Sequence, residues 1–233
     1  MVVSSGFKLM QVISNLSDEQ KKIVKEINFS SILHLSCSSV PRNLFLWLAE
    51  HFETASNTVN LPHGFSFSLN SSVVHKVLGI PHTSRQIQCS TTEDSYQFMK
   101  SQFKSDGRTP SVDELVAIIS PDLSGDHFAR AFMLLVLSSF LCPNKRNMAS
   151  SKYYSSLVSV PEIKEFDWCS LVLQWLNSSI RKFQNCKSLG QSIPTGGCAF
   201  LLVVNETLYL YTLISDINRI FFSCLIYFSH HNQ

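Results

Sequence analysis

The clearest pattern of apolar and polar positions lies near residues 57–69, where the two kinds of residue alternate along two short stretches. Alternation with a period of two is typical of strands that are buried on one face. The turn residues Pro62, His63 and Gly64 separate the two stretches. The pattern therefore predicts a small β-hairpin, and its buried face carries Val59, Leu61, Phe65, Phe67 and Leu69.

A short, sharply delimited helix is predicted directly after this hairpin. Asn70 stands where a side chain can cap the first turn, and Gly79 stands where a left-handed residue can end the last turn. Apolar residues recur at helical spacing between them, and Pro81 follows the stop. We expect this helix to pack directly behind the hairpin.

Apolar residues at helical spacing predict further helices along the rest of the chain. The expected helices cover residues 19–27, 41–52, 91–103, 110–119, 124–141 and 167–183. Within residues 41–52, one buried stripe is expected to consist of Leu44, Trp47, Leu48, His51 and Phe52. Residues 128–141 are apolar nearly all round, which predicts a helix at the centre of the fold.

Cap residues mark where several of these helices begin. Ser17 or Asp18 is expected to cap the first helix, Ser124 the central helix and Asp167 the last. Glu162 and Glu165 lie just before Asp167, so their negative charge is expected to favour the same helix start.

Together these elements predict a mainly α fold, a compact bundle of about eight helices with the one small β-hairpin. A chain of 233 residues fits one domain. We expect a flexible N-terminus over residues 1–16, a helical domain over residues 17–204 and an atypical apolar segment over residues 205–233. Two polar stretches, residues 83–90 and 144–151, are expected to form exposed loops and to be the first candidates for a binding surface.

Residues 198–228 are strongly apolar, but polar and charged residues divide them into short pieces. Each piece is shorter than the roughly 20 residues that cross a bilayer as a helix. Membrane association through this segment is therefore the less favoured alternative.

Composition argues against two further classes of protein. With 45% hydrophobic and 15% charged residues, the chain does not have the composition of an intrinsically disordered protein. The 19 Lys and Arg residues nearly balance the 17 Asp and Glu residues, and the basic residues come at most in pairs. The sequence thus carries no direct signature of nucleic-acid binding.

The seven cysteines are scattered, and most of them lie in apolar helical stretches. This placement is typical of reduced thiols that pack as small core residues. They are Cys37, Cys89, Cys142, Cys169, Cys186, Cys198 and Cys224. Residues 1–20 lack the continuous apolar stretch of an export signal, so we expect the protein inside the cell, in the cytosol or nucleus.

Catalytic, cofactor and metal motifs are not found in the sequence. No two cysteines have the spacing of a zinc knuckle, and the pair Gly196 and Gly197 lacks the glycine and lysine pattern of a nucleotide loop. Cys37 lies near a predicted helix start, where the helix dipole can acidify a thiol, but a structural thiol is the favoured interpretation. We expect no catalytic residue, no cofactor and no metal site.

Histidines and tryptophans are also expected to be structural. His34 and His51 lie near or on apolar helical faces, while His230 and His231 lie at the end of the chain. The tryptophans occur in helical stripes together with Leu and Val, which favours core packing over a stacking surface for bases or sugars. These tryptophans are Trp47, Trp168 and Trp175.

Residues 60–81, NLPHGFSFSLNSSVVHKVLGIP, resemble the core signature of the plant mobile domain. This family, also called the aminotransferase-like plant mobile domain, is found in plant transposable elements and in host proteins derived from them. Four further blocks resemble the family in the same order: residues 17–52, 128–158, 166–184 and 196–204. The family name implies no transaminase activity.

The resemblance implies a non-catalytic protein-interaction or scaffolding domain of a transposon-derived plant protein. Such a domain would work in the nucleus with a protein partner, and its residues 197–204 would form a packed core helix. The alternative is that the chain is the N-terminal fragment of a polyprotein whose missing C-terminal part is a cysteine protease acting on ubiquitin-like modifiers. In that case too, the chain itself would be inactive.

Overall fold

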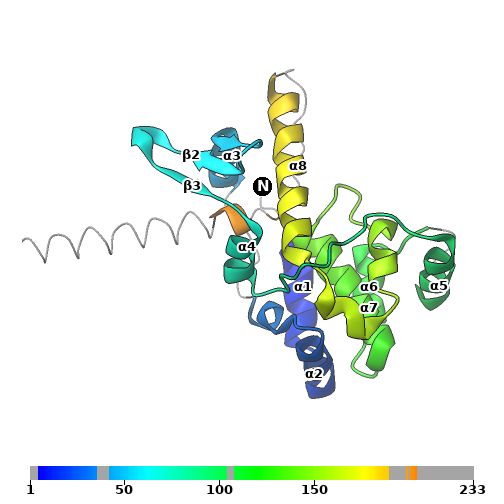
Figure 1. Ribbon diagram of the computed structural model, residues 1–233. Helices are drawn as coiled ribbons and strands as arrows, with labels where there is room; N and C mark the ends of the chain where they lie inside the picture. Colours follow the sequence, from blue (N-terminus) through cyan, green and yellow to red (C-terminus); the bar gives the residue numbers. More distant parts are fainter. Residues whose placement is uncertain (1–4, 36–41, 104–107, 189–197, 199, 204–233) are drawn as a thin grey trace, which may run out of the picture.

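The computed structural model describes residues 5–35, 42–103, 108–188, 198 and 200–203 (Figure 1). These residues form a mainly helical fold with one small antiparallel sheet, which confirms the predicted fold class. The α-helices are α1 (Ser5–Ser14), α2 (Asp18–Glu26), α3 (Arg42–Glu50), α4 (Ser71–Leu78), α5 (Glu93–Phe103), α6 (Val112–Ile118), α7 (Gly125–Val136) and α8 (Trp168–Ser188). Shorter helical turns are η1 (Ser30–His34), η2 (Pro62–Gly64), η3 (Leu137–Leu141), η4 (Ser151–Ser156) and η5 (Val160–Glu165).

The N-terminal segment is ordered, so the prediction of a flexible stretch over residues 1–16 is wrong for the part that the structure describes. Helix α1 packs against η3 and α6. Its buried residues Leu9, Val12 and Ile13, and Leu16 just after its end, recur at helical spacing. The rest of the fold shields these apolar side chains from water, and this burial stabilises the folded chain. Helix α1 is therefore part of the domain.

The first predicted helix starts as its sequence indicates. Ser17 and Gln20 form a capping box at the start of α2, because the Ser17 side chain accepts from the backbone of Gln20 while the Gln20 side chain accepts from that of Ser17. The Gln20 amide also donates to the carbonyls of Ser120 and Leu123, both at 2.8 Å. One side chain thus starts α2 and ties it to the turn before α7.

The predicted hairpin is present as β2 (Thr58–Asn60) and β3 (Ser66–Ser68), joined by η2. Val59 pairs with Phe67 and both are buried, but Phe65 is 41% exposed at the turn. A third strand, β1 (Phe52–Glu53), pairs with β2. Phe52 was expected to continue a helical stripe; it lies instead in β1, because α3 ends at Glu50 and the chain turns back to pair with β2.

The helix after the hairpin has both predicted ends. The Asn70 side chain accepts a hydrogen bond from the backbone of Val73 at 3.0 Å, and Gly79 ends α4 with a φ of 60°. A Cβ atom at Gly79 would lie 2.7 Å from the Cβ of Ser31, so the chain of η1 crosses directly over this residue. Gly79 is therefore required both by its backbone conformation and by the close approach of η1.

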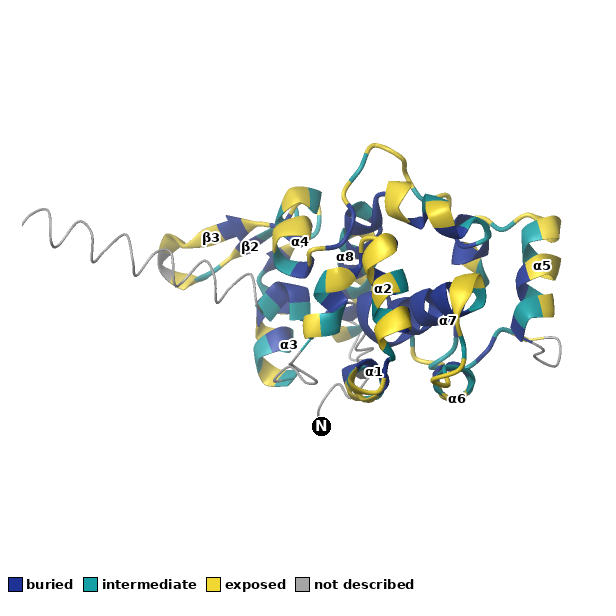
Figure 2. Ribbon diagram, turned by 90° about the horizontal axis from the view of Figure 1, so that it is seen from below, coloured by how far each residue is buried: buried dark blue, intermediate teal, exposed yellow. Residues whose placement is uncertain are grey.

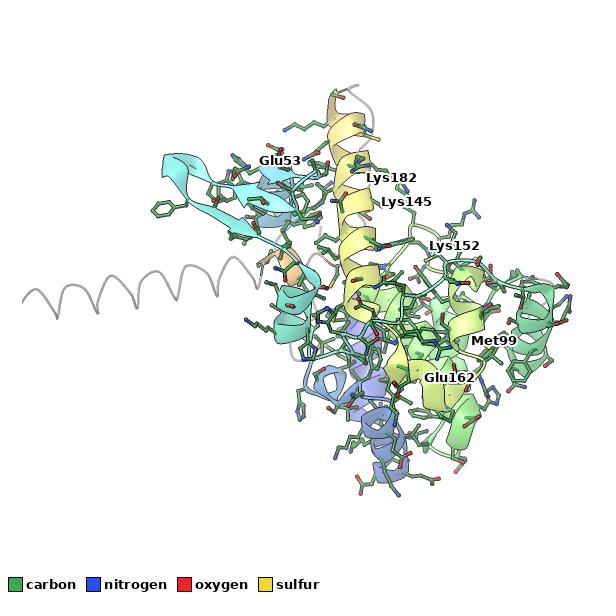
Figure 3. The ribbon with its side chains drawn as sticks, in the orientation of Figure 1. Glu53, Met99, Lys145, Lys152, Glu162 and Lys182 are labelled. Atoms are coloured by element: carbon green, nitrogen blue, oxygen red, sulfur yellow. The ribbon has the colours of Figure 1, made fainter. Side chains whose placement is uncertain are left out.

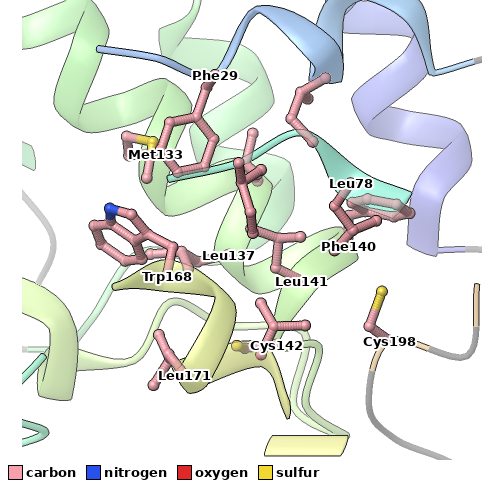
Figure 4. Packing of buried hydrophobic residues seen from close by; sticks show 14 of the residues in the cluster. Phe29, Leu78, Met133, Leu137, Phe140, Leu141, Cys142, Trp168, Leu171 and Cys198 are labelled. Carbon is pink, nitrogen blue, oxygen red and sulfur yellow. The ribbon is translucent and has the colours of Figure 1, made fainter. Parts of the chain in front are cut away.

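Helix α7 and the π-helical turn η3 form the centre of the molecule. Every residue from 128 to 141 is buried, and Figure 2 shows α7 as an almost continuous dark blue helix. The Ser138 and Ser139 hydroxyls donate to the carbonyls of Leu134 and Leu135, each at 2.6 Å, which satisfies these polar groups inside the core. Figure 4 shows Leu137, Phe140 and Leu141 packed towards Trp168 and Leu78.

Arg130 is the charged exception in this helix, and its side chain is satisfied almost entirely by backbone. Its Nε donates to the Leu157 carbonyl at 3.1 Å, and one terminal nitrogen donates to the Val158 carbonyl at 2.7 Å. The same nitrogen lies 3.0 Å from the Asp126 carboxylate. Arg130 therefore ties α7 to the chain that follows η4.

Helix α8 is long and central, lying between the sheet with α3 and the α5 to α7 region (Figure 1). Asp167 caps it as predicted: its carboxylate accepts from the Ser170 backbone at 3.0 Å and from the Ser170 hydroxyl at 2.6 Å. The buried face of α8 consists of Trp168, Cys169, Leu171, Val172, Leu176, Ile180 and Phe183. Because this face runs the length of the helix, α8 joins the two sides of the fold.

Two helix predictions need correction in detail. Trp47 is 37% exposed, because α3 turns Phe45, Leu48 and Ala49 inward. Helix α6 begins after Ser111, whose side chain forms a capping box with Glu114, and not at residues 109–110. Ser124 is in the cap position of α7 as predicted, but its side chain makes no capping hydrogen bond.

The described part of the C-terminal region supports the predicted core helix. Cys198, Leu201 and Leu202 are buried, and residues 200–203 are helical. The apolar segment over residues 205–233 lies outside the described residues. Among the helices that the structure describes, none combines the length and the apolar character needed to cross a membrane.

Candidate binding groove

The loop over residues 83–90 is mostly exposed, as predicted, but it is fixed to the start of α8. The Arg85 carbonyl accepts from the Asp167 backbone at 2.8 Å, and the Thr83 hydroxyl donates to the Glu165 carbonyl at 2.6 Å. The Arg85 guanidinium lies 2.6 Å from the Glu162 carboxylate and 4.3 Å from the centre of the Phe166 ring. Glu162 therefore pairs with Arg85, which is a more specific role than the predicted support of a helix start.

The loop over residues 144–151 is less exposed than predicted, since only Lys145 and Arg146 are exposed and Ala149 is buried, and it is fixed as well. The Asn144 side chain donates to the Met148 carbonyl at 2.6 Å and accepts from the Arg146 backbone at 3.0 Å. At its C-terminal end, the Ala149 backbone donates to the Pro110 carbonyl at 2.8 Å. The loop is thereby closed on itself and held against the residues that start α6.

Both loops lead into one concave surface, which we call the Lys152 groove. It consists of two adjoining pockets of about 250 and about 380 Å³ that share Lys152. The smaller pocket is lined by Cys89, Lys152, Tyr153, Leu171, Gln174, Trp175, Ser178, Ser179 and Lys182. The larger and shallower pocket is lined by Thr91, Glu93, Tyr96, Ser151 and Lys152.

The smaller pocket of the groove is positively charged. Lys152 and Lys182 form no ion pair with another described residue, and none of the residues that line this pocket is acidic. Figure 3 shows Lys145, on the loop over residues 144–151, in the same part of the molecule. The nearest acidic side chain of the groove, Glu93, lies in the larger pocket and accepts from the Gln97 amide at 2.6 Å.

Apolar side chains form the rigid part of the smaller pocket. Trp175 donates from its indole nitrogen to the Pro143 carbonyl at 3.2 Å, which fixes the ring beside the loop over residues 144–151. Leu171 and Tyr153 are buried beneath it. Burial raises the pKa of the Tyr153 hydroxyl well above its usual range, so this group stays protonated.

Thiol chemistry is not favoured at the buried cysteines. Burial raises the pKa of the thiols of Cys169 and Cys198 to about 12, and it raises that of Cys142 even further. The Cys169 thiol lies 3.4 Å from the Ile80 carbonyl and donates to it. These groups are therefore neutral packing residues, as predicted, whereas Cys89 is exposed at the edge of the groove and Cys186 is half-buried.

The histidines and tryptophans singled out in the sequence do not converge on a reactive site. His34 is exposed, and the His51 ring lies beside that of Trp47, with ring centres 4.8 Å apart and the rings tilted by 45°. Trp168 is a fully buried core residue, as predicted, whereas Trp175 is half-buried, packs against the core and also lines the groove. Several other candidates lie outside the described residues: Cys37, Gly196, Gly197, Cys224, His230 and His231.

Metal and cofactor sites find no support in the described part of the chain. No group of three or more His, Cys, Asp or Glu side chains there could hold a metal ion. A further pocket of about 520 Å³ between α1, α2 and α6 is lined by neutral residues, including Gln11, Asn15 and Gln20. This pocket offers no charged group with which to select a ligand.

Sequence reasoning identified the two loops but not the groove between them. A signal for its outer wall was present, because Gln174, Ser178 and Lys182 recur every four residues and so form a polar stripe on a helix whose opposite face is apolar. The partner segments of this stripe lie about 30 to 90 positions away in the chain, around Lys152 and Cys89. Periodicity within one helix does not reveal such distant neighbours.

Comparison with known proteins gives a family and no further detail. No curated protein and no solved structure has significant similarity to this chain. The family model described as a domain of unknown function (DUF8566) matches residues 4–203, which include α1 and end with the helical residues 200–203. The chain therefore belongs to this family.

Proposed function

We propose that the chain is a non-catalytic protein-interaction domain of a transposon-derived plant protein, related to the plant mobile domain and working in the nucleus. The observation that carries the proposal is the Lys152 groove. Three segments that are distant in the sequence meet there around a fixed tryptophan, and the groove is lined by two exposed lysines that pair with no acidic side chain among the described residues. Concave surfaces of this kind are typical of sites that hold a ligand or a peptide segment.

The state of the cysteines supports binding over catalysis. A nucleophilic thiol must be accessible and ionised, and the thiols of Cys142, Cys169 and Cys198 are neither. Cys89 is exposed, but the residues that line its pocket include no histidine or carboxylate to act as a base. The smaller pocket therefore has polar and apolar groups that can hold a partner, and its lining lacks the usual base to activate a nucleophile.

The link to the plant mobile domain is supported by the sequence blocks that resemble that family. The block with the hairpin signature corresponds to β2, β3 and α4, and the later blocks correspond to α7, η4, α8 and the helical residues 200–203. Placement in the nucleus follows from the same resemblance.

The experiment that tests this proposal uses the full chain, tagged and expressed in plant cells. We expect nuclear fluorescence and the recovery of a protein partner after crosslinking. The recovered partner is then purified and titrated against the purified chain by calorimetry, where we expect saturable binding with defined stoichiometry. Replacing Trp175 with Ala should weaken this binding, whereas the Phe7→Ala variant, altered at an exposed site on α1, should bind normally.

Two results would contradict the proposal. One is turnover of a substrate by the purified chain that is lost in a folded Cys89→Ala variant, because an accessible thiol would then be catalytic. The other is full binding of the identified partner by the Trp175→Ala variant, provided that its thermal unfolding matches that of the unaltered chain. Loss of binding in that folded variant supports the groove as the contact surface.

A further inference from the structure

We infer that the smaller pocket of the Lys152 groove binds a phosphorylated serine or threonine side chain of the protein partner. This inference rests on the proposed function and specifies the chemistry of the recognised segment. Lys152 and Lys182 both line the smaller pocket, and none of the residues in its lining is acidic. An uncompensated pair of positive charges at the edge of a pocket attracts an anion.

The amount of charge favours a phosphate over a carboxylate. A phosphorylated side chain carries a charge of about −1.5 to −2 at neutral pH and has three acceptor oxygens. It can therefore pair with Lys152 and Lys182 together, whereas a single carboxylate would neutralise only one of them. Charge-assisted hydrogen bonds of this kind are stronger than neutral ones.

Further donors are available beside the two lysines. The Ser178 and Ser179 hydroxyls line the same pocket and make no hydrogen bond to another described residue. Because α8 carries both serines and Lys182 within two turns, these groups are presented on one rigid element. Trp175, held by the Pro143 carbonyl, supplies an apolar wall for the methylene or methyl group next to the phosphate.

The neighbouring pocket argues for a phosphopeptide and against a nucleic acid. A nucleic-acid strand would continue its negative charge along the groove and would meet the Glu93 carboxylate. A peptide carries its phosphate on one residue, and the next residues can be neutral or basic. The shared position of Lys152 between the two pockets fits an extended segment with its anionic residue at the Lys182 end.

The test uses the full chain and three fluorescein-labelled peptide pools of equal length with randomised flanks. The central residue is phosphoserine, serine or glutamate. We expect the phosphoserine pool to bind at least about tenfold more tightly than the serine pool by fluorescence polarisation, and more tightly than the glutamate pool. Millimolar inorganic phosphate should compete, and binding should weaken as salt is raised.

Charge reversal locates the site. The Lys152→Glu/Lys182→Glu variant should lose at least about tenfold in affinity for the phosphoserine pool. The matched control is Lys76→Glu/Lys164→Glu, which makes the same change in net charge at two exposed lysines that do not line the groove. The control should change the affinity less than about twofold.

Four outcomes would overturn the inference. The first is equal affinity for the phosphoserine and serine pools, and the second is equal affinity for the phosphoserine and glutamate pools. The third is an equal loss in the groove variant and the control, which would show a general effect of net charge. The fourth is tight binding of single-stranded DNA that is lost in the groove variant, while the phosphoserine pool binds no better than the serine pool.

The same variants separate this inference from the proposed function. If the natural partner still binds the Lys152→Glu/Lys182→Glu variant, the chain remains an interaction domain and only the recognition of phosphate is refuted. If the phosphoserine pool binds as expected but no protein partner is recovered, phosphate recognition by the smaller pocket is confirmed and the proposed function is contradicted. Dephosphorylating the recovered partner should abolish its binding if both are correct.

Discussion

Helix α7 and the groove side of α8 differ in how their side chains are distributed between core and surface. Residues 128–136 of α7 are all buried, and the one charged residue among them, Arg130, is satisfied by backbone carbonyls and Asp126. On α8, Gln174, Ser178 and Lys182 are exposed along one stripe while the opposite face is buried. The comparison indicates that stability is concentrated in α7 and that α8 serves both the core and the surface.

The largest expected effect is at the centre of α7. Phe132 is fully buried and stacks on Phe128 with ring centres 5.6 Å apart. Replacing Phe132 with Ala removes a large apolar side chain and leaves a cavity, so we expect a loss of about 3–5 kcal/mol in the free energy of unfolding. Urea denaturation followed by circular dichroism measures it.

The control for this substitution is Phe7→Ala, because Phe7 is also helical but is 53% exposed. We expect it to lower the free energy of unfolding by less than about 1 kcal/mol. A similar loss in both variants would contradict the conclusion that burial in α7, and not aromatic content in general, stabilises the fold.

A smaller effect is expected where the chain crosses Gly79. Replacing Gly79 with Ala would force a Cβ to within 2.7 Å of the Ser31 Cβ and 2.8 Å of its hydroxyl oxygen, which donates to the Leu78 carbonyl. Together with the strain of a positive φ, this should cost about 2–3 kcal/mol. Thermal and urea unfolding of the purified variant measure the loss.

Gly125 provides the matched control, since its φ of 61° is nearly that of Gly79 and a Cβ there would meet nothing within 4 Å. Gly125→Ala should therefore cost only the backbone strain, about 1 kcal/mol. The difference between the two variants isolates the contact with Ser31. Equal losses would show that the crossing of η1 over α4 contributes nothing.

These elements show how far the sequence determines the fold. Asn70, Gly79 and Asp167 mark helix ends through local chemistry, and all three act in the structure as predicted. Trp47 was placed on the wrong face because residues 44–48 are all apolar, so the periodicity within this short helix does not distinguish one face from another. Helix α1 was missed although Leu9, Val12, Ile13 and Leu16 have helical spacing.

The groove was less predictable than the fold for a physical reason. Its lining comes from the segments around Cys89, Lys152 and Trp175, and only tertiary packing brings these together. Local propensity predicts that residues 83–90 and 144–151 are loops, but it carries no information about which distant carbonyl or carboxylate will hold each loop. The hydrogen bonds from Asp167 to Arg85 and from Trp175 to Pro143 supply that information.

The free energy of unfolding is expected to depend on pH through a surface group at the start of α6. Hydrogen bonds from Ser111 and the nearby Arg108 guanidinium lower the pKa of Glu114 from 4.5 to about 2. Because the folded pKa is depressed, the stabilisation is fully present above pH 4.5 and is lost as the pH falls towards 2. Urea midpoints measured between pH 5 and pH 2.5 should therefore fall less steeply in Glu114→Gln than in the unaltered chain.

Asp122 is the control for this titration, because it is exposed and its side chain has no hydrogen bond or ion pair to another described residue. The Asp122→Asn variant should keep the pH dependence of the unaltered chain. If Glu114→Gln also keeps it, the capping box of α6 does not contribute to stability through the ionised carboxylate.

The smallest expected effect is on the stability of the groove itself, and it sharpens the comparison between α7 and α8. Lys152 and Lys182 are exposed and form no ion pair with another described residue, so replacing both with Ala should change the free energy of unfolding by less than about 0.5 kcal/mol. Any change within this range is expected to be a small stabilisation, because the substitution removes the repulsion between two like charges in one pocket. Matched urea titrations of the variant and the unaltered chain measure the difference. A loss above about 1 kcal/mol would mean that the lysines support the fold, whereas unchanged stability is the result that the proposed binding role requires.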